Sequence, residues 1–248
     1  MSKLSGGGPI PAPSTFCAVY LFRMRRFGLF LVIFLATGLL TRGQNPLSVS
    51  PPEKNNSPQA ELASFSIDSR LQVNLFADET MGIANPICFR WDPLGRLWVL
   101  CTWAYPQLKP GTKPDDKLII LEDTDGDGRA DKSSTFADGL NMPTGFALGH
   151  GGVYIGNGRD LIHVKDTSGN GKADQKKILF TGFGTGDTHQ NINSFAWTPG
   201  GELLFSQGLH CFSRVETPWG IRRLDEHGSW RLRPLRRQLH SYRRTSGG

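Results

Sequence analysis

The feature that most constrains the fold of this chain is a repeated acidic hairpin. The segment "LIILEDTDGDGRADK" (118–132) is echoed by "LIHVKDTSGNGKADQ" (161–175), which begins 43 residues later. In each copy an apolar, strand-like run leads into an Asp/Gly-rich turn, and a second strand-like run follows. A weaker third copy, "IRRLDEHGSWRL" (221–232), keeps the hairpin pattern without the regularly spaced acids of the first two. Such a repeat predicts that one supersecondary unit is used several times.

A second type of hairpin alternates with the first. The segments "NPICFRWDPLGRLWVL" (85–100), "PTGFALGHGGVYIG" (143–156) and "INSFAWTPGGELLFSQ" (192–207) each consist of an apolar strand, a glycine turn and another apolar strand. Short strands with a period of roughly 40 to 55 residues are typical of a β-propeller, whose blades have about four strands each. We therefore predict an all-β chain with a β-propeller fold. Stacked calcium-binding repeats or a jelly roll are alternatives, but neither explains two alternating hairpin types as well.

The length of the repeated region sets the expected number of blades. One blade has two apolar faces that it cannot bury alone, so blades stack around an axis. The region holds enough residues for about three to four blades, and a closed propeller usually has more. We expect residues 63–232 to be part of a six-bladed-type propeller. The arginine-rich residues 233–248 lack the strand pattern and are predicted to be a disordered basic tail, either a truncated or frame-shifted end or a genuine tail.

The N-terminal sequence indicates export. Four residues, "RMRR" (23–26), precede fourteen residues (27–40) that are apolar apart from Thr37 and two glycines. This run is shorter than the roughly 20 residues of a membrane span and fits the apolar region of a signal peptide. We predict a signal peptide over 1–43, with a start at Met24 as a hypothesis and an uncleaved membrane anchor as the alternative. The protein is then periplasmic or in the cell envelope.

A polar, Pro/Ser/Asn-rich segment over 44–62 is predicted to be a linker. Beyond it, the distribution of charge argues against nucleic acid as a partner. The net charge of +6 is concentrated at the C-terminal end, where residues 222–248 hold eight arginines and two acidic residues. Residues 44–221 contain 15 basic and 20 acidic residues. A nucleic-acid-binding domain usually spreads basic charge over one folded face.

Several other motifs are weak. Cys88 and Cys101 lie on the two arms of one predicted hairpin, so either a disulfide or two free thiols is compatible with the sequence. The histidines other than His189 form no HxH or HxxxH pair, and we expect them to be surface or structural residues. The stretch "GFGTG" (182–186) lacks the Lys-Ser/Thr and the helix of a phosphate-binding loop.

The first acidic turn has the oxygen donors of a calcium site. An EF-hand would require flanking helices and an acidic residue at the twelfth position, where Ser134 stands. The flanking segments favour strands, and the nine-residue spacing resembles the calcium hairpins of integrin-type propellers. We predict that calcium is bound by Asp123, Asp125, Asp127, the carbonyl of Arg129 and Asp131. The second turn offers Asp166, Ser168, Asn170 and Asp174. The alternative for both is an Asp/Gly turn held by side-chain hydrogen bonds.

Three segments carry a resemblance to a known family. They are "DTHQNINSFAWTPGGELLFSQG" (187–208), the DxDGDGxAD hairpins and "NLFADETMGIANPICFRWDPLGRLWV" (74–99). With these in order over about residues 71–230, the chain resembles a family of membrane-bound dehydrogenases related to the soluble quinoprotein glucose/sorbosone dehydrogenases.

The resemblance implies an activity and assigns residues to it. By motif, His189 is the general base that takes a hydroxyl proton while hydride passes to pyrroloquinoline quinone (PQQ), and Gln190 is close to that cofactor. An imidazole with a pKa near about 6.5 suits this role at neutral pH. The expected substrate is a sugar or an alcohol, and the electron acceptor is not specified. The alternative is a histidine that only closes the loop by hydrogen bonding.

The sequence also departs from this family. The relatives draw most cofactor-binding residues from the second half of the propeller, and longer members carry a helical-repeat region and a CxxCH segment that are absent here. The chain is therefore expected to be a dehydrogenase domain that is inactive if truncated. The competing hypothesis is a non-enzymatic, calcium-stabilised propeller that binds carbohydrate or protein.

Overall fold

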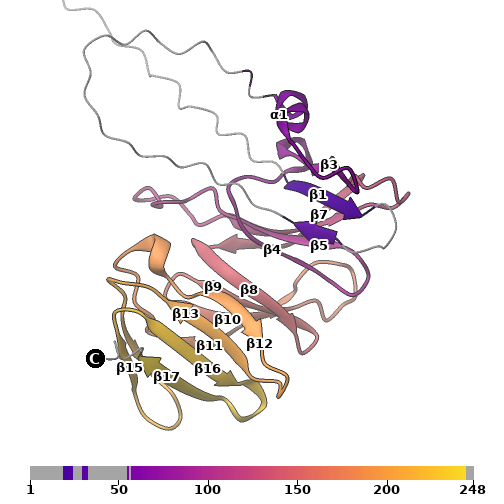
Figure 1. Ribbon diagram of the computed structural model, residues 1–248. Helices are drawn as coiled ribbons and strands as arrows, with labels where there is room; N and C mark the ends of the chain where they lie inside the picture. Colours follow the sequence, from indigo (N-terminus) through magenta and orange to yellow (C-terminus); the bar gives the residue numbers. More distant parts are fainter. Residues whose placement is uncertain (1–18, 25–29, 33–54, 56, 244–248) are drawn as a thin grey trace, which may run out of the picture. The chain divides into compact units, whose positions relative to one another are not determined.

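The computed structural model describes residues 19–24, 30–32, 55 and 57–243 of the 248-residue chain (Figure 1). They fall into two compact units, Met1–Asp78 and Glu79–Gly248. Strands form most of the regular structure in these residues, beside one seven-residue α-helix and three 3-10 turns. The predicted all-β class is confirmed.

The first unit contains a three-stranded antiparallel sheet in the order β2-β1-β3. Its strands are β1 (Val19–Met24), β2 (Phe30–Val32) and β3 (Leu71–Ala77). Most of the segment predicted to be a signal peptide lies outside the described residues. Among the residues that are described, no helix is long and apolar enough to cross a membrane.

The helix α1 (Pro58–Ser64) corrects the predicted end of the linker at residue 62. Ser57 caps it, because its hydroxyl accepts a hydrogen bond from the backbone N–H of Ala60 at 3.2 Å. Pro58 occupies the first turn, where its missing N–H is not needed. The polar composition that suggested a linker is therefore also the composition of a capped, exposed helix.

The second unit is built from three successive four-stranded antiparallel sheets. The first contains β4 (Pro86–Trp91), β5 (Leu97–Cys101), β6 (Asp116–Glu122) and β7 (Lys132–Leu140). The second contains β8 (Pro143–Gly149), β9 (Gly152–Asn157), β10 (Asp160–Lys165) and β11 (Gln175–Thr181). The third contains β12 (Asn193–Trp197), β13 (Leu203–Gln207), β16 (Gly228–Arg233) and β17 (Gln238–Arg243). The hairpin of β14 (Phe212–Val215) and β15 (Arg222–Asp225) is inserted between β13 and β16.

The third sheet departs from the prediction at two places. The segment 221–232, interpreted as a third copy of the acidic hairpin, is divided, because β15 pairs with β14 whereas β16 pairs with β13 and β17. The predicted disordered tail from residue 233 contains β17, up to Arg243. The reason is the alternation in β16, where Trp230 and Leu232 are buried and Arg231 and Arg233 occupy the other face, and the buried Leu239 of β17 pairs with Leu232. Residues 244–248 lie outside the described part.

The first strands of the three sheets pack beside one another, since β8 contacts both β4 and β12 (Figure 1). Close approach is possible because Gly145 has no side chain, and a Cβ there would come within 2.9 Å of the Phe195 ring. The indole N–H of Trp197 donates to the carbonyl of Leu148 at 2.8 Å, and the guanidinium of Arg90 donates to the carbonyl of Phe195 at 3.1 Å. The buried side chains form two core clusters, one between the first and second sheets and one between the second and third.

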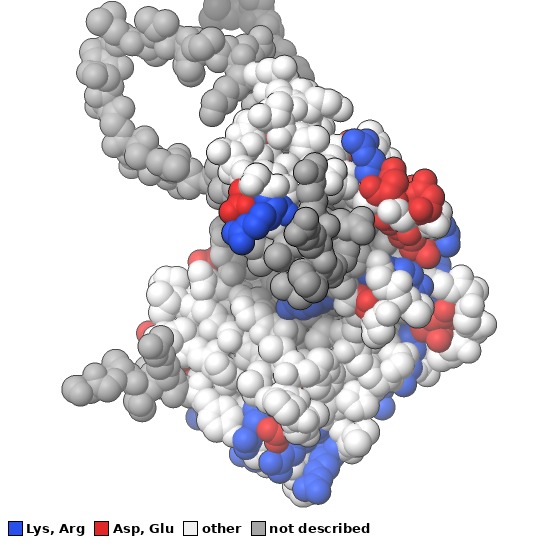
Figure 2. All heavy atoms as spheres, turned by 45° about the vertical axis from the view of Figure 1, so that its right-hand side comes forward, with Lys and Arg blue, Asp and Glu red and all other residues white. Residues whose placement is uncertain are grey.

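These sheets have two ends, a crossover end and a hairpin end. The chain passes from one sheet to the next at the crossover end, which also carries the connections 102–115 and 208–227. The hairpin end carries the turns 92–96, 150–151 and 198–202 together with the loops 123–131, 166–174 and 234–237. Acidic side chains gather in a compact patch on the face shown in Figure 2, and basic side chains lie beside it and lower on the same face.

The cysteines do not form the disulfide that was one of two alternatives. Cys88, Cys101 and Cys211 are not in disulfides. Pro86, not Cys88, is the cross-strand partner of Cys101, and Cys88 pairs with Leu100.

Candidate functional site

His189 lies at the crossover end, in the short 3-10 turn η2 (Thr188–Gln190) that links β11 to β12. Asp187 caps this turn, and its Oδ1 accepts the backbone N–H of His189 at 3.0 Å. The same oxygen is 3.0 Å from Nδ1 of the imidazole. A carboxylate accepts hydrogen bonds, so Nδ1 carries the proton in the neutral ring and Nε2 is left as the proton acceptor. The residue order "DTH" therefore orients an imidazole whose side chain is 65% exposed.

Tyr105, which the sequence analysis did not single out, completes this group from the connection between β5 and β6. Its ring meets the His189 ring edge to face, with centroids 5.1 Å apart. Partial burial raises the pKa of the Tyr105 hydroxyl, and the charge of Asp187 acts in the same direction. The hydrogen bond from the His189 side chain lowers the pKa of Asp187, which keeps this carboxyl ionised. No local sequence signal pairs Tyr105 with His189.

Gln190 lies beside His189 but is tied to the protein. Its carbonyl accepts the N–H of Gly208 at 2.9 Å and the thiol of Cys211 at 3.1 Å. A Cβ at Gly208 would overlap the Gln190 side chain, so the amide packs directly against this glycine. These contacts fix Gln190 in place, and its closeness to a cofactor stays a prediction.

Asn191 is the next residue and is fully buried. Neither Oδ1 nor Nδ2 of its side chain has a hydrogen-bond partner among the described residues. A buried, unpaired amide is costly, by about 1 to 3 kcal/mol, so native structures normally satisfy it with water, an ion or a ligand. An unsatisfied polar group thus lies two residues from His189.

The "GFGTG" stretch is explained by packing. Gly182, Gly184 and Gly186 lie against the backbone of 210–215, where any Cβ would overlap main-chain atoms. The N–H of Arg214 donates to the carbonyl of Gly182 at 2.8 Å, and the N–H of Gly184 donates to Ser213 Oγ at 2.9 Å. The glycines therefore dock the link that carries His189 onto the inserted hairpin.

Asp116 is a second residue at the crossover end that the sequence analysis did not identify. Its buried carboxylate accepts four hydrogen bonds, from the Thr102 hydroxyl at 2.8 Å and from three backbone N–H groups. Those groups belong to Trp103 at 2.6 Å, Ala104 at 3.0 Å and Met142 at 2.8 Å. One side chain thus fixes both the connection that carries Tyr105 and the passage to the second sheet.

The first acidic loop, at the hairpin end, brings three of its predicted ligands together. Carboxylate oxygens of Asp123, Asp125 and Asp131 lie within 4.8 Å of one another. Asp127 is not in this group. Its Oδ1 accepts the N–H of Arg129 at 2.7 Å. Arg129, whose carbonyl was the remaining predicted ligand, is exposed in the same loop. Hydrogen bonds from Thr124 lower the pKa of Asp131.

The second acidic loop has a similar backbone but does not form such a group. Asp166 accepts the N–H groups of Gly169 and Gly171, both at 2.7 Å, and the Gly171 bond lowers its pKa most. Ser168 donates its hydroxyl to Asp166, and Oδ1 of Asn170 accepts the N–H of Lys172 at 2.9 Å. The fourth predicted ligand, Asp174, is bonded to the N–H and hydroxyl of Thr167. Within the described residues, only the first loop gathers three carboxylates.

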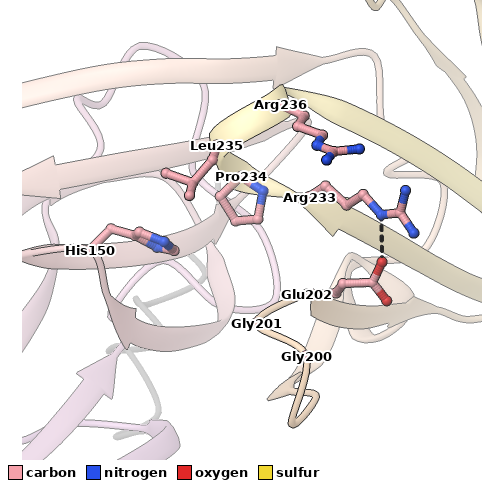
Figure 3. Close-up of a pocket in the computed structure, with 8 residues that line it drawn as sticks. All are labelled: His150, Gly200, Gly201, Glu202, Arg233, Pro234, Leu235 and Arg236. Carbon is pink, nitrogen blue, oxygen red and sulfur yellow. Dashed lines mark hydrogen bonds and ion pairs between the residues drawn. The ribbon is translucent and has the colours of Figure 1, made fainter.

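A cavity of about 450 Å³ opens at the hairpin end (Figure 3). Three turns form it: the β8–β9 turn at His150, the β12–β13 turn at 200–202, and residues 233–236, which contain the 3-10 turn η3 (Pro234–Arg236). The sequence analysis did not foresee this cavity, because its walls come from segments about 30 to 80 residues apart.

Comparison with known proteins gives one family and several partial structural matches. The family model described as "Domain of unknown function (DUF7133)" matches residues 57–248. None of the curated proteins matches this chain.

The first structural match is an iodide structure of a Trichoderma reesei carbohydrate-active enzyme of family AA12, with 16% identity and a TM-score of 0.38. The second is a luciferin-regenerating enzyme, with 15% identity and a TM-score of 0.41. The matches cover 52% and 63% of this chain, which spans 31% and 50% of those chains.

Proposed function

The chain belongs to the DUF7133 family, and we propose that its second unit is part of a β-propeller whose crossover end binds a sugar or alcohol for dehydrogenation. The three sheets are its blades, with β4, β8 and β12 nearest the axis. The propeller is supported by the repeated antiparallel order and by the contacts between these first strands.

The observation that carries the activity is the hydrogen-bonded pair of Asp187 and His189. Asp187 holds Nδ1, so Nε2 of the exposed imidazole accepts the proton of a substrate hydroxyl. The hydride of the same carbon passes to a separate two-electron acceptor. Asn191 supports a binding site here, because a substrate hydroxyl or a water bound with it would satisfy the buried amide.

The acceptor that the resemblance implies would need anion-binding groups beside His189. PQQ is a tricarboxylate, and carboxylates in proteins are held by cationic or N–H donors. In the described part of the chain, the ion pair of His189 is with Asp187, and no lysine or arginine pairs with either residue. No step is therefore assigned to this cofactor, and the proton acceptance by His189 does not depend on it.

We include calcium in the proposal as a structural ion at the first acidic loop. Three converging carboxylates suit a hard cation that prefers oxygen ligands. The loop follows the end of β6, whereas the connection with Tyr105 precedes its start, so about 23 Å of strand separate them. Calcium at this loop stiffens a hairpin and does not take part in the chemistry.

Export to the periplasm or cell envelope is also part of this proposal and is supported by the apolar run 27–40.

Dye-linked oxidation by the full chain tests the activity, with a panel of sugars and alcohols, added calcium and added quinone. His189→Gln is expected to lower kcat by at least about 100-fold, because general-base catalysis contributes about 10²- to 10⁴-fold. Asp187→Asn should also lower kcat and should shift the pH profile, as expected of a positioning residue. His240, in the middle of the outer strand β17, provides the control, and His240→Gln should retain full activity.

Two results would contradict the proposal. Oxidation that is unchanged in His189→Gln would exclude the base. If no substrate of the panel is oxidised but the wild-type chain binds a sugar, and His189→Gln abolishes that binding, the crossover end is a binding site only. That outcome would favour the second candidate, a calcium-stabilised carbohydrate-binding module, for which the three-carboxylate loop is the specific observation.

A further inference from the structure

The cavity at the hairpin end has no part in the function proposed above. His189 precedes β12, and the 200–202 turn follows it, so the two sites lie at opposite ends of a five-residue strand. At about 3.4 Å per residue, this strand separates them by about 17 Å. A volume of about 450 Å³ lies within the range of about 300 to 1,000 Å³ that is usual for small-molecule sites.

The charged side chains of the cavity leave it positive. Glu202 accepts a hydrogen bond from Nε of Arg233 at 2.6 Å, which fixes the guanidinium plane. Arg231 adds a more distant contact to the same carboxylate, at 3.8 Å. Arg236 lines the cavity and forms no ion pair within the described residues. Figure 3 shows the guanidinium groups of Arg233 and Arg236 on one side of the cavity. Two cations against one lining carboxylate favour an anionic ligand.

The rest of the lining suits a hydroxylated ring. His150 is held by a 3.1 Å hydrogen bond between its Nδ1 and the Tyr154 hydroxyl, so its imidazole has a fixed orientation beside the cavity. Pro234 and Leu235 add an apolar surface, and Leu235 is 86% exposed. A sugar presents both C–H faces and hydroxyl groups, and this combination matches an apolar surface next to a carboxylate and an imidazole.

The positive charge is specific to the third sheet. The corresponding connections of the first and second sheets, between their last two strands, are the acidic loops 123–131 and 166–174. In the third sheet the connection between β16 and β17 reads "PLRR" (234–237). The same position in the repeat therefore carries opposite charge, and only the basic version borders the cavity.

We propose that this cavity binds a small anionic sugar, one that carries a carboxylate or a phosphate group. The anionic group contacts Arg236 and the outer edge of Arg233, where guanidinium N–H groups match two oxygens of one anion. The hydroxyl groups face Glu202 and His150, and the ring lies on Pro234 and Leu235.

Isothermal titration calorimetry on the full chain tests this with three probes: glucuronate, glucose 6-phosphate and glucose. At least one anionic sugar should bind at least about tenfold more tightly than neutral glucose, and the two anionic probes distinguish a carboxylate from a phosphate ligand. Arg236→Gln should weaken the binding by about tenfold, the equivalent of about 1.4 kcal/mol. Arg236→Lys should recover only part of it, because a lysine lacks the paired N–H geometry.

Arg159→Gln is the matched control. Arg159 is an exposed arginine in the β9–β10 turn at the crossover end, so its replacement removes the same charge without touching the cavity. The proposal is overturned if neither anionic sugar binds, if glucose binds as tightly as both, or if Arg236→Gln and Arg159→Gln weaken binding equally. Binding that persists in His189→Gln places the ligand away from the crossover end and keeps this test separate from that of the dehydrogenase.

Discussion

The crossover end and the hairpin end of the same sheets are built in different ways. At the crossover end, long connections are held by buried polar groups and by glycines packed against backbone, as Asp116 and Gly184 show. At the hairpin end, the two acidic loops are closed mainly by their own side chains, as in the bonds of Asp123 to Gly126 and Gly128. Short-range closure allows a loop to differ from its counterparts, and the same position is acidic in two sheets and basic in the third.

The largest expected effect is at Asp116. Asp116→Ala leaves four donors without their acceptor, three of them backbone N–H groups, and should lower the free energy of unfolding by about 3 kcal/mol or more. Chemical denaturation measures this, with Asp127→Ala at the exposed hairpin end as the control, expected within about 0.5 kcal/mol of wild type. If the alanine variant does not fold, Asp116→Asn, which retains one acceptor oxygen, is measured in its place. Equal losses of unfolding free energy at Asp116 and Asp127 would show that the two ends do not differ in how they are stabilised.

Gly184→Ala should have the next largest effect. The added Cβ would overlap the backbone of Cys211 and Phe212, so the link to His189 must shift, and we expect a loss of about 2 kcal/mol. The control is Gly126→Ala in the first acidic loop, where a Cβ meets nothing within 4 Å and only the positive φ of 78° opposes it. That loss should be about 1 kcal/mol. Thermal denaturation of both variants would show whether backbone contact outweighs φ strain.

Calcium distinguishes the two acidic loops. Calcium chloride should raise the Tm by a few degrees, since a ligand bound only to the folded state stabilises it, by about 2.7 kcal/mol at 100 times its Kd. Asp123→Asn should remove most of this rise because it breaks the three-carboxylate group, whereas Asp166→Asn should remove less. Chelation should reverse the rise. If both variants lower the calcium response equally, the difference in carboxylate number between the loops is not what decides binding.

The smallest expected change in stability is at Asn191. Asn191→Leu replaces an unpaired buried amide with an apolar side chain of similar size and should stabilise the protein by about 1 kcal/mol. If this amide binds substrate, the same variant should raise KM in the oxidation assay. A loss of stability would instead show that water already satisfies Asn191, and an unchanged KM would remove it from the substrate site.

The local parts of the fold were predictable from sequence. The hairpins of β4–β5, β8–β9 and β12–β13 follow from apolar runs around glycine turns, and the structure confirms them. The capping carboxylate of Asp187 is two residues from His189, so the contact between them could also be predicted from the sequence. The β17 strand was missed because its buried Leu239 is paired with Leu232 of β16 across an arginine-rich turn, and that pairing is not visible as a local pattern.

By itself, the sequence determined the all-β class, the repeat and the residues of the acidic loops, because hairpins depend on neighbours within about ten residues. Only the tertiary structure decided which of those residues meet. It placed Tyr105 beside His189, separated Asp127 from the other three carboxylates, and assembled a cavity from three turns. The physical reason is that the packing of sheets and the course of long connections depend on contacts between distant segments, which no local pattern records.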